Sequence, residues 1–367
     1  MAIYPKLILD ALKTVRYPGT GKDIVEMGMV DEDIHIDGMK VSVTLITQKV
    51  NDPFIRSVVK MAESAILTHV DKEIEIKGNI TVKAKQAPPA KPNLLPEVKN
   101  IIAVASGKGG VGKSTVTTNL AVALAKQGYK VGVLDADIFG PSIPKMLNTE
   151  GERPLLEEMD GRDMIQPAEN HGVKMLSIGY FVDADDAVVW RGSLASNALT
   201  QLIRDANWGE LDYFLIDLPP GTSDIHLTIV QNIPVTGAVI VSTPQEVALA
   251  DARKGISMFT GDKVGVPILG LVENMAWFTP AELPDNKYYI FGKDGCKRLA
   301  EESGYELLGQ IPLVQSIREG GDAGAPVALN ENSITGMAFA ELASRVVEAV
   351  DKRNRELPET GVVQMVK

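Results

Sequence analysis

A glycine-rich run at residues 107–114 carries the residue types that bind phosphate groups. Glycines let successive backbone N–H groups converge on phosphate oxygens without Cβ clashes, and a following helix N-terminus adds a favourable potential. We expect Lys113 to reach the β- and γ-phosphates and the Ser114 hydroxyl to bind Mg²⁺. The run therefore predicts a nucleotide-binding loop, which consists of Gly107, Lys108, Gly109, Gly110, Val111, Gly112, Lys113 and Ser114.

A second template fits the same glycines. They also spell G-x-G-x-x-G, and Asp135 ends the next apolar segment, as in the dinucleotide-binding fold of nicotinamide oxidoreductases. The Lys-Ser pair that closes the run has no role in a dinucleotide turn, whereas a phosphate loop uses both residues. A later apolar segment ends in Asp217, and the stiff Pro-Pro-Gly sequence 219–221 follows it, suited to sensing a γ-phosphate. These features favour an ATPase.

Three carboxylates are candidates for the chemistry. Asp217, at the end of an apolar segment, is expected to anchor Mg²⁺ together with Ser114. Asp135 and Asp137 lie two residues apart in an extended segment, so both are expected to face the phosphates. One would hold metal-bound water, which makes Asp135 a magnesium candidate, and Asp137 would orient the attacking water. The alternative role of Asp217 is that of a capping acid at a strand end, and the alternative for Asp137 is an ordinary loop acid.

The segments that position these residues are short and almost continuously apolar. Such runs are typical of strands buried on both faces of a parallel sheet. The runs cover residues 101–105, 131–134, 213–216, 238–241, 268–272 and 307–311, and helical patterns separate them, as at 114–126 and 246–260. A last helix is expected at 334–353. The pattern predicts an α/β, doubly wound, mostly parallel-sheet P-loop NTPase domain at 100–355, with a tail at 356–367.

A different pattern precedes this domain. A helix is expected at 5–16, a hairpin turning at Asp37-Gly38, a helix at 53–70 and a strand at 73–84. These elements predict a small α+β domain at residues 1–85. Four prolines, Pro88, Pro89, Pro92 and Pro96, then indicate a semi-rigid linker at 86–99.

Composition limits the cellular location and the classes of partner that we expect for this protein. Asp and Glu number 48 against 37 Lys and Arg, which gives a net charge of −11 and argues against nucleic-acid or anionic-membrane partners. The single cysteine excludes an internal disulfide framework and fits a reducing, cytoplasmic location. Charged residues interrupt the apolar N-terminal segment, so we expect no signal peptide, and no apolar run is long enough for a spanning helix.

The phosphate motifs resemble those of a known class. Residues 108–114 are similar to the deviant Walker A motif of MinD, ParA and the nitrogenase iron protein. Segments 135–142, 217–222 and 243–246 narrow the resemblance to the Mrp family. The N-terminal module and its Pro-rich linker also resemble Mrp, whose N-terminal domain occurs on iron–sulfur and metal-centre maturation factors.

The resemblance implies a function and further site residues. It implies a homodimer that binds and hydrolyses ATP with magnesium and hands iron–sulfur clusters to client proteins. Within the dimer, Lys108 is implied to reach the partner's nucleotide, which makes hydrolysis depend on dimerisation. Asn274 matches the position that contacts adenine; the alternative is a strand-end turn former.

One part of the family pattern is absent. Members that carry clusters have a Cys-x-x-Cys after the strand that ends near Met275, and residues 277–289 contain no cysteine. A [4Fe–4S] cluster usually takes four thiolates, and the chain offers only Cys296, at the expected start of a helix. Cys296 is thus the one thiol candidate for a cluster, and a small packed residue is its alternative. Besides a cluster carrier, an ATP-gated scaffold or a MinD/ParA-like switch without a cluster remains open.

Overall fold

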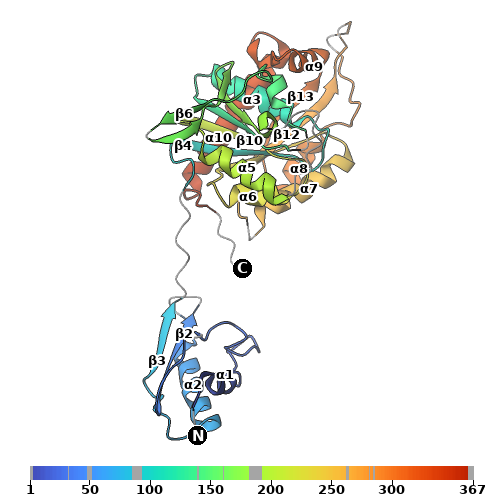
Figure 1. Cartoon of the computed structure of the whole chain (residues 1–367). Helices are drawn as coiled ribbons and strands as arrows, with labels where there is room; N and C mark the ends of the chain where they lie inside the picture. The colour runs from blue at the N-terminus through green and yellow to red at the C-terminus, as the bar shows by residue number, and fades with distance from the viewer. Residues whose placement is uncertain are drawn as a thin grey trace. The chain divides into compact units, whose positions relative to one another are not determined.

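A computed structural model describes residues 3–31, 33–47, 52–84, 93–138, 140–159, 161–181, 192–261, 264–280, 282–283 and 286–362. The chain divides into two compact units, Met1–Ala90 and Lys91–Lys367 (Figure 1). Residues 86–92 of the predicted linker and 363–367 of the predicted tail lie outside the described ranges. The boundaries assigned to linker and tail therefore stay predictions.

The N-terminal unit is a three-stranded sheet packed on two helices. Strand β1 (His35–Asp37) pairs antiparallel with β2 (Lys40–Thr47), and β3 (Ile80–Ala84) lies parallel to β2 on its other side. The crossover to β3 runs through α2 (Ile55–His69), which packs against α1 (Pro5–Leu12). Alternate residues of β2 are buried, so one face of the sheet forms the core with the two helices.

The predicted hairpin is present, but two neighbouring elements are shorter than predicted. The first helix ends at Leu12, because Thr14 and Val15 donate to carbonyls three residues back and the chain turns away. The last strand begins at Ile80 instead of residue 73. Gly78, with φ of 80°, closes a turn there, and the buried Ile76 fills the core from that turn.

The C-terminal unit is built on an eight-stranded sheet. Its strand order is β13-β12-β11-β4-β10-β5-β9-β8, and all neighbours are parallel except β8 and β9. The strands are β4 (Val98–Ala105), β5 (Val131–Asp135), β8 (Ala168–Asn170), β9 (Val173–Ser177), β10 (Leu211–Asp217), β11 (Gly237–Ser242), β12 (Ile268–Phe278) and β13 (Leu307–Leu313). The predicted fold class, doubly wound and mostly parallel, is confirmed. The edge strand β8, its neighbour β9 and a separate ribbon of β6 (Leu156–Met159) and β7 (Arg162–Ile165) were not predicted.

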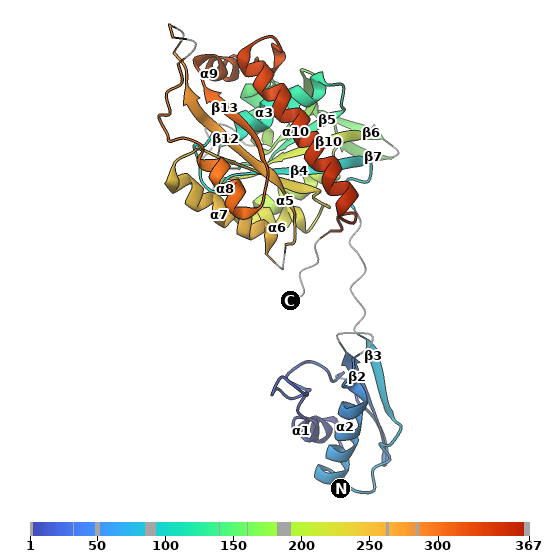
Figure 2. The same ribbon diagram turned by 180° about the vertical axis from the view of Figure 1, so that it is seen from behind.

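Helices cover both faces of this sheet, as Figures 1 and 2 show from opposite sides. Helices α3 (Lys113–Lys126), α4 (Ile143–Met146) and α10 (Ile334–Glu356) share one apolar core with the sheet. Helices α5 (Gly192–Arg204), α6 (Asp224–Val230), α7 (Glu246–Thr260) and α8 (Gly295–Ser303) share the other. Helix α9 (Gln315–Asp322) has no buried residue, and short 3₁₀ turns lie at Ile178–Phe181 and Val327–Leu329. Within the described ranges we find no helix with the length and apolar character needed to span a membrane.

This topology brings the sequence motifs together. The parallel strands β4, β5, β10 and β12 all end at one edge of the sheet. The phosphate loop follows β4, while Asp135 and Asp217 end β5 and β10 and face each other in register. Because β4 has β10 on one side and β11 on the other, chain connections diverge there, which leaves a crevice at the carboxyl edge.

Candidate nucleotide-binding site

Two glycines of the phosphate loop occupy places where a Cβ would clash with a neighbouring atom. A Cβ on Gly107 would lie 2.1 Å from the backbone carbon of Asp251, because α7 packs directly on the loop. Gly112 has φ of 78°, and a Cβ there would lie 2.2 Å from Asn274 Nδ2. Gly107 is therefore required by the close contact with α7, and Gly112 by the left-handed turn at the start of α3.

Helix α3 begins with a cluster of polar side chains around the buried carboxylate of Asp217. Lys113 Nζ lies 2.7 Å from Asp217 Oδ2, and the Ser114 hydroxyl donates to the same oxygen at 2.6 Å. Thr117 donates its hydroxyl to Asp217 Oδ1 at 2.6 Å. Thr117 was not predicted, although its position three residues after Ser114 places both on one face of the helix. The predicted lysine, serine and aspartate meet at one point.

The two acids after β5 point to different places. Asp137 borders the phosphate cavity, with Oδ2 3.9 Å from Lys113 Nζ. Asp135 does not border it: its carboxylate accepts hydrogen bonds from the backbone N–H groups of Asp137 and Ile143 and from the Ser177 hydroxyl. The expectation that both face the phosphates fails for Asp135, because its bond to the N–H two residues on turns the chain out of strand geometry. Burial, and then the charge of Asp217, raise the pKa of Asp135 to about 7.

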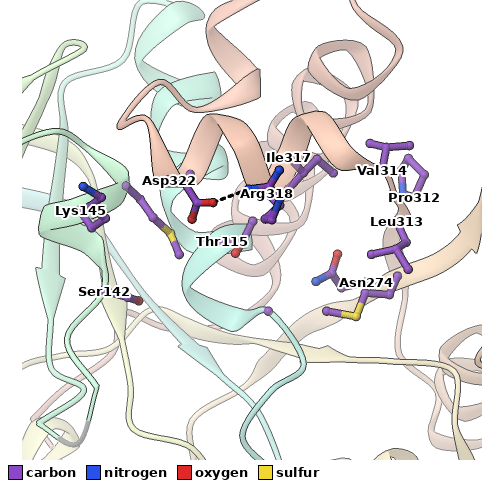
Figure 3. A pocket seen from close by; sticks show the side chains of 14 residues that line it. Thr115, Ser142, Lys145, Asn274, Pro312, Leu313, Val314, Ile317, Arg318 and Asp322 are labelled. Atoms are coloured by element: carbon purple, nitrogen blue, oxygen red, sulfur yellow. Dashed lines mark hydrogen bonds and ion pairs between the residues drawn. The ribbon is translucent and has the colours of Figure 1, made fainter. Parts of the chain in front are cut away.

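Two adjoining cavities lie along the loop. The first, of about 200 Å³, is lined by the loop itself, Asp137 and Pro220. The second, of about 360 Å³, shares Gly112 and Thr115 with the first and extends under α9 (Figure 3). Its walls are Asn274, Met275, Pro312, Leu313, Val314, Ile317, Arg318, Gly321, Asp322, Ser142, Lys145 and Met146. A polar end joined to a larger, mostly apolar pocket suits a ligand with a phosphate group and an aromatic ring.

Helix α9 forms a wall of the second pocket that was not predicted. Arg318 and Asp322 form an ion pair of 2.7 Å along this helix, and Figure 3 shows it above Thr115. Their spacing of four residues marks them as neighbours on one helical face. Nothing in that spacing indicates that the face lies against a loop two hundred residues earlier, which tertiary packing alone decides.

Asn274 lies against the phosphate loop. Its Nδ2 donates to the carbonyl of Val111 at 2.8 Å, and its side chain borders the second pocket. The next residue, Met275, has φ of 55°, an uncommon backbone for a non-glycine residue. The predicted adenine contact thus lies at a suitable place, beside both the loop and the pocket.

Lys108 borders the phosphate cavity and is partly exposed. Its carbonyl accepts the Ser106 hydroxyl at 3.0 Å, which fixes the backbone. The described residues supply no hydrogen-bond or ion-pair partner to its ammonium group, in contrast to the tightly held Lys113.

Cys296 lies away from these groups, in the first turn of α8, where a helix start was predicted. The residue is fully buried, and its backbone N–H donates to the carboxylate of Glu273 at 2.6 Å. Burial, together with Glu273, raises the pKa of the Cys296 thiol well above its usual range. Metal ligation needs a thiolate, so this packing disfavours Cys296 as a ligand. In the part of the chain that the structure describes, no group of three or more His, Cys, Asp or Glu side chains is placed to hold a metal ion.

Two protein-family models match the chain. Residues 97–347 match the ParA-type family described as the NUBPL iron-transfer P-loop NTPase. Residues 6–96 match the family described as iron-sulfur cluster assembly protein. The two matches divide the chain as its two compact units do.

Curated relatives and solved structures agree with this assignment. The iron-sulfur cluster carrier protein of Synechocystis sp. is 41% identical over 94% of this chain and 97% of its own length. The iron-sulfur protein required for NADH dehydrogenase of Arabidopsis thaliana is 51% identical, over 72% of this chain and 83% of its own. A nucleotide-binding protein of Archaeoglobus fulgidus, solved with ADP, has 39% identity and a TM-score of 0.55, covering 63% of this chain and 88% of that one. The MinD cell-division ATPase of Pyrococcus furiosus has 25% identity and a TM-score of 0.51, over 68% and 98%. The resemblance seen in the motifs is confirmed, and the chain belongs to the NUBPL iron-transfer P-loop NTPase family, with an iron–sulfur cluster assembly module ahead of the NTPase domain.

Proposed function

We propose that this protein is an ATP-hydrolysing iron–sulfur cluster carrier that works as a homodimer and delivers clusters to apoproteins. The observation that carries the nucleotide part is the meeting of Lys113, Ser114 and Asp217 at the start of α3, beside two joined cavities. Relatives named as cluster carriers, similar over almost the whole chain, support the cargo.

The residues present fit magnesium. Ser114 Oγ and the Asp217 carboxylate are oxygen donors 2.6 Å apart, the ligand type that Mg²⁺ prefers. When bound, the ion neutralises charge that develops on the transferred phosphoryl group. Lys113 is then the cation for the β- and γ-phosphates, and Asp137, on the cavity wall, accepts a hydrogen bond from the attacking water. Asp135 accepts hydrogen bonds from two backbone N–H groups and from the Ser177 hydroxyl, and these bonds fix the segment that carries Asp137.

The second pocket is the proposed site of the base and ribose. Its apolar walls suit an aromatic ring, and Asn274 brings an amide to its edge. Lys108 is proposed to serve the partner's nucleotide, because it borders the phosphate cavity and its ammonium group has no partner among the described residues.

A second candidate concerns the cluster. A dimer of this chain has two cysteines, and Cys296 is buried with a raised pKa. An ATP-gated scaffold that holds no cluster itself is therefore the second candidate, whereas the relatives named as cluster carriers support the first.

Two measurements test these functions. Titration calorimetry should detect ATP and ADP binding in the presence of Mg²⁺, and steady-state assays should detect phosphate release; absence of nucleotide binding contradicts the proposal. Anaerobic reconstitution followed by iron analysis separates the two cargo models. Iron that binds the wild type and is lost in Cys296→Ala supports a cluster on Cys296. Absence of bound iron supports the scaffold, and equal binding to both proteins excludes Cys296 as the ligand.

A further inference from the structure

The loop that follows Asp217, residues 218–223, is tied down at its upstream half. Leu218 donates its N–H to the carbonyl of Val104 at 3.1 Å, and Gly221 donates to the carbonyl of Ser106 at 2.9 Å. Both acceptors belong to the segment that leads into the phosphate loop, and Pro220, between the two bonds, borders the phosphate cavity. The upstream half of the loop is thus fixed to the nucleotide site by backbone bonds.

The downstream end, Ser223, is the N-cap of α6, and His226 in the first turn of that helix completes a capping box with it. The Ser223 N–H donates to His226 Nδ1 at 3.2 Å, and the Ser223 hydroxyl lies 3.0 Å from the same nitrogen. The N–H of His226 in turn donates to the Ser223 carbonyl at 3.1 Å. Every hydrogen bond that the described residues make to Ser223 therefore comes from His226, while Thr222, between the two tied ends, is exposed.

Burying His226 at this packed position costs free energy. It is 1% exposed, and its ring lies edge-on to Phe259 of α7, 6.3 Å between centroids. Because Nδ1 accepts a backbone N–H, the ring proton resides on Nε2, and the described residues give Nε2 no partner. A buried donor without a partner costs about 1–3 kcal/mol. Burial lowers the pKa of His226 to about 4, so the ring stays neutral and Nδ1 stays an acceptor at neutral pH.

We propose that His226 is a positioning residue for nucleotide turnover, which fixes the junction of loop 218–223 with α6 and so limits the motion of the loop beside the phosphate cavity. The inference rests on the proposed ATPase function and adds a residue that touches neither nucleotide nor metal. Its physical basis is the two-point attachment: with the bonds between Ser223 and the His226 ring broken, only the backbone bonds of Leu218 and Gly221 hold the loop, and Pro220 between them gains freedom of movement at the cavity. A misplacement of about 1 Å near reacting groups lowers a rate by up to about a hundredfold.

The test compares an acceptor and an apolar side chain at position 226. In His226→Asn, the side-chain oxygen falls near the place of Nδ1 and can accept from Ser223. In His226→Leu, the side chain has no acceptor, so the Ser223 N–H and hydroxyl lose theirs, while the backbone bond to the Ser223 carbonyl remains. We expect kcat for ATP to fall about tenfold in His226→Leu and to stay within about threefold of wild type in His226→Asn. ADP affinity, which does not depend on loop closure over a γ-phosphate, should stay within about twofold in both.

A packing control separates positioning from stability. Phe259→Leu removes the ring beside His226 and leaves the bonds to Ser223, so melting temperature should fall while kcat stays near wild type. The proposal is overturned if His226→Leu keeps wild-type kcat, if a folded His226→Asn loses as much activity as His226→Leu, or if Phe259→Leu loses it equally. A wild-type protein that binds no ATP instead contradicts the proposed function itself, so the two failures differ.

Discussion

Asp217 shows how much of the site depends on single hydrogen bonds. Its buried carboxylate is shared by an ammonium group and two hydroxyls, all from the first turns of α3. Among the residues that the structure describes, Thr117 is the one side chain that bonds to Oδ1, and it is fully buried. Such a bond to a charged acceptor is worth more than one to a neutral acceptor.

Thr117→Val should therefore destabilise the protein. Valine keeps the shape of threonine but leaves one oxygen of a buried carboxylate without this donor, which costs about 1–3 kcal/mol. Thr118→Val is the matched control, since Thr118 is equally buried but its hydroxyl donates to an uncharged acceptor, the Met146 sulfur, at 3.6 Å. Urea unfolding of both variants measures the difference. Equal losses would mean that the Thr117–Asp217 bond contributes nothing special.

His226 also makes stability depend on pH. The pKa is lowered to about 4 in the folded protein from 6.5 in the unfolded chain. The unfolded chain therefore takes up a proton as pH falls below 6.5, while the folded protein does not until about pH 4. The stability present above pH 6.5 is lost progressively over this window, by at most about 3 kcal/mol.

The measurement is the unfolding free energy of wild type minus that of His226→Asn, from pH 7 to pH 4. We expect this difference to fall as the solution becomes more acidic. Asp135, with a pKa raised to about 7, acts in the opposite direction, but it is present in both proteins and cancels in the difference. A difference that is constant with pH would show that His226 titrates normally.

At the scale of elements, the phosphate loop could be predicted because its information is local. Residues 107–114 are contiguous, and the strand before and the helix after them follow from periodicity; α7 begins and ends where it was predicted. The second pocket could not be predicted in the same way. Its walls come from α3, α4, β12, β13 and α9, and among the residues of β12 to α9 only Asn274 was predicted, from the family resemblance. The contact of Gly107 with Asp251 is likewise a property of packing, invisible in either segment alone.

Two loop glycines allow the cost of a left-handed backbone to be compared with the cost of a clash against another segment. Gly110 and Gly112 have nearly equal φ values, 80° and 78°, but a Cβ on Gly110 meets nothing within 4 Å, while one on Gly112 meets Asn274 at 2.2 Å. Gly110→Ala should cost about 1–2 kcal/mol of backbone strain. Gly112→Ala should cost clearly more, because the Asn274 bond to Val111 must also break. Equal unfolding free energies for the two variants would show that Asn274 moves aside freely.

At the scale of the whole molecule, the two units have separate cores and match separate families. The division into two units could be predicted from the sequence. The prolines at 88–96 separate an N-terminal segment of alternating apolar residues from a C-terminal segment of continuous apolar runs. The short antiparallel strands β6 to β8 gave no comparable signal, because strands of three or four residues show too few alternations to distinguish them from loops. For Cys296, the sequence predicted that it is the single cysteine and that it lies at the start of a helix. Its contact with Glu273 could not be predicted, because that contact depends on the tertiary fold.

The proposed role of Lys108 can be tested only in the assembled protein. Lys108→Ala should leave ATP binding largely intact, because Lys113 and Asp217 remain in place, and should abolish hydrolysis if the ammonium group acts on the partner's nucleotide. A lysine that acted within its own chain would give the same result, so the single variant does not establish the direction.

Mixed dimers establish it. In a dimer of Lys108→Ala with Lys113→Ala, the first subunit keeps Lys113 in its own phosphate loop and receives Lys108 from the second. Each variant alone is expected to be inactive, and an equal mixture should recover about a quarter of wild-type activity, since half of randomly formed dimers are mixed and each has one complete site. A mixture as inactive as its components would place Lys108 on its own nucleotide, because no subunit then contains both lysines. Prior isolation of the mixed dimer by two affinity tags distinguishes that result from a failure of subunits to exchange.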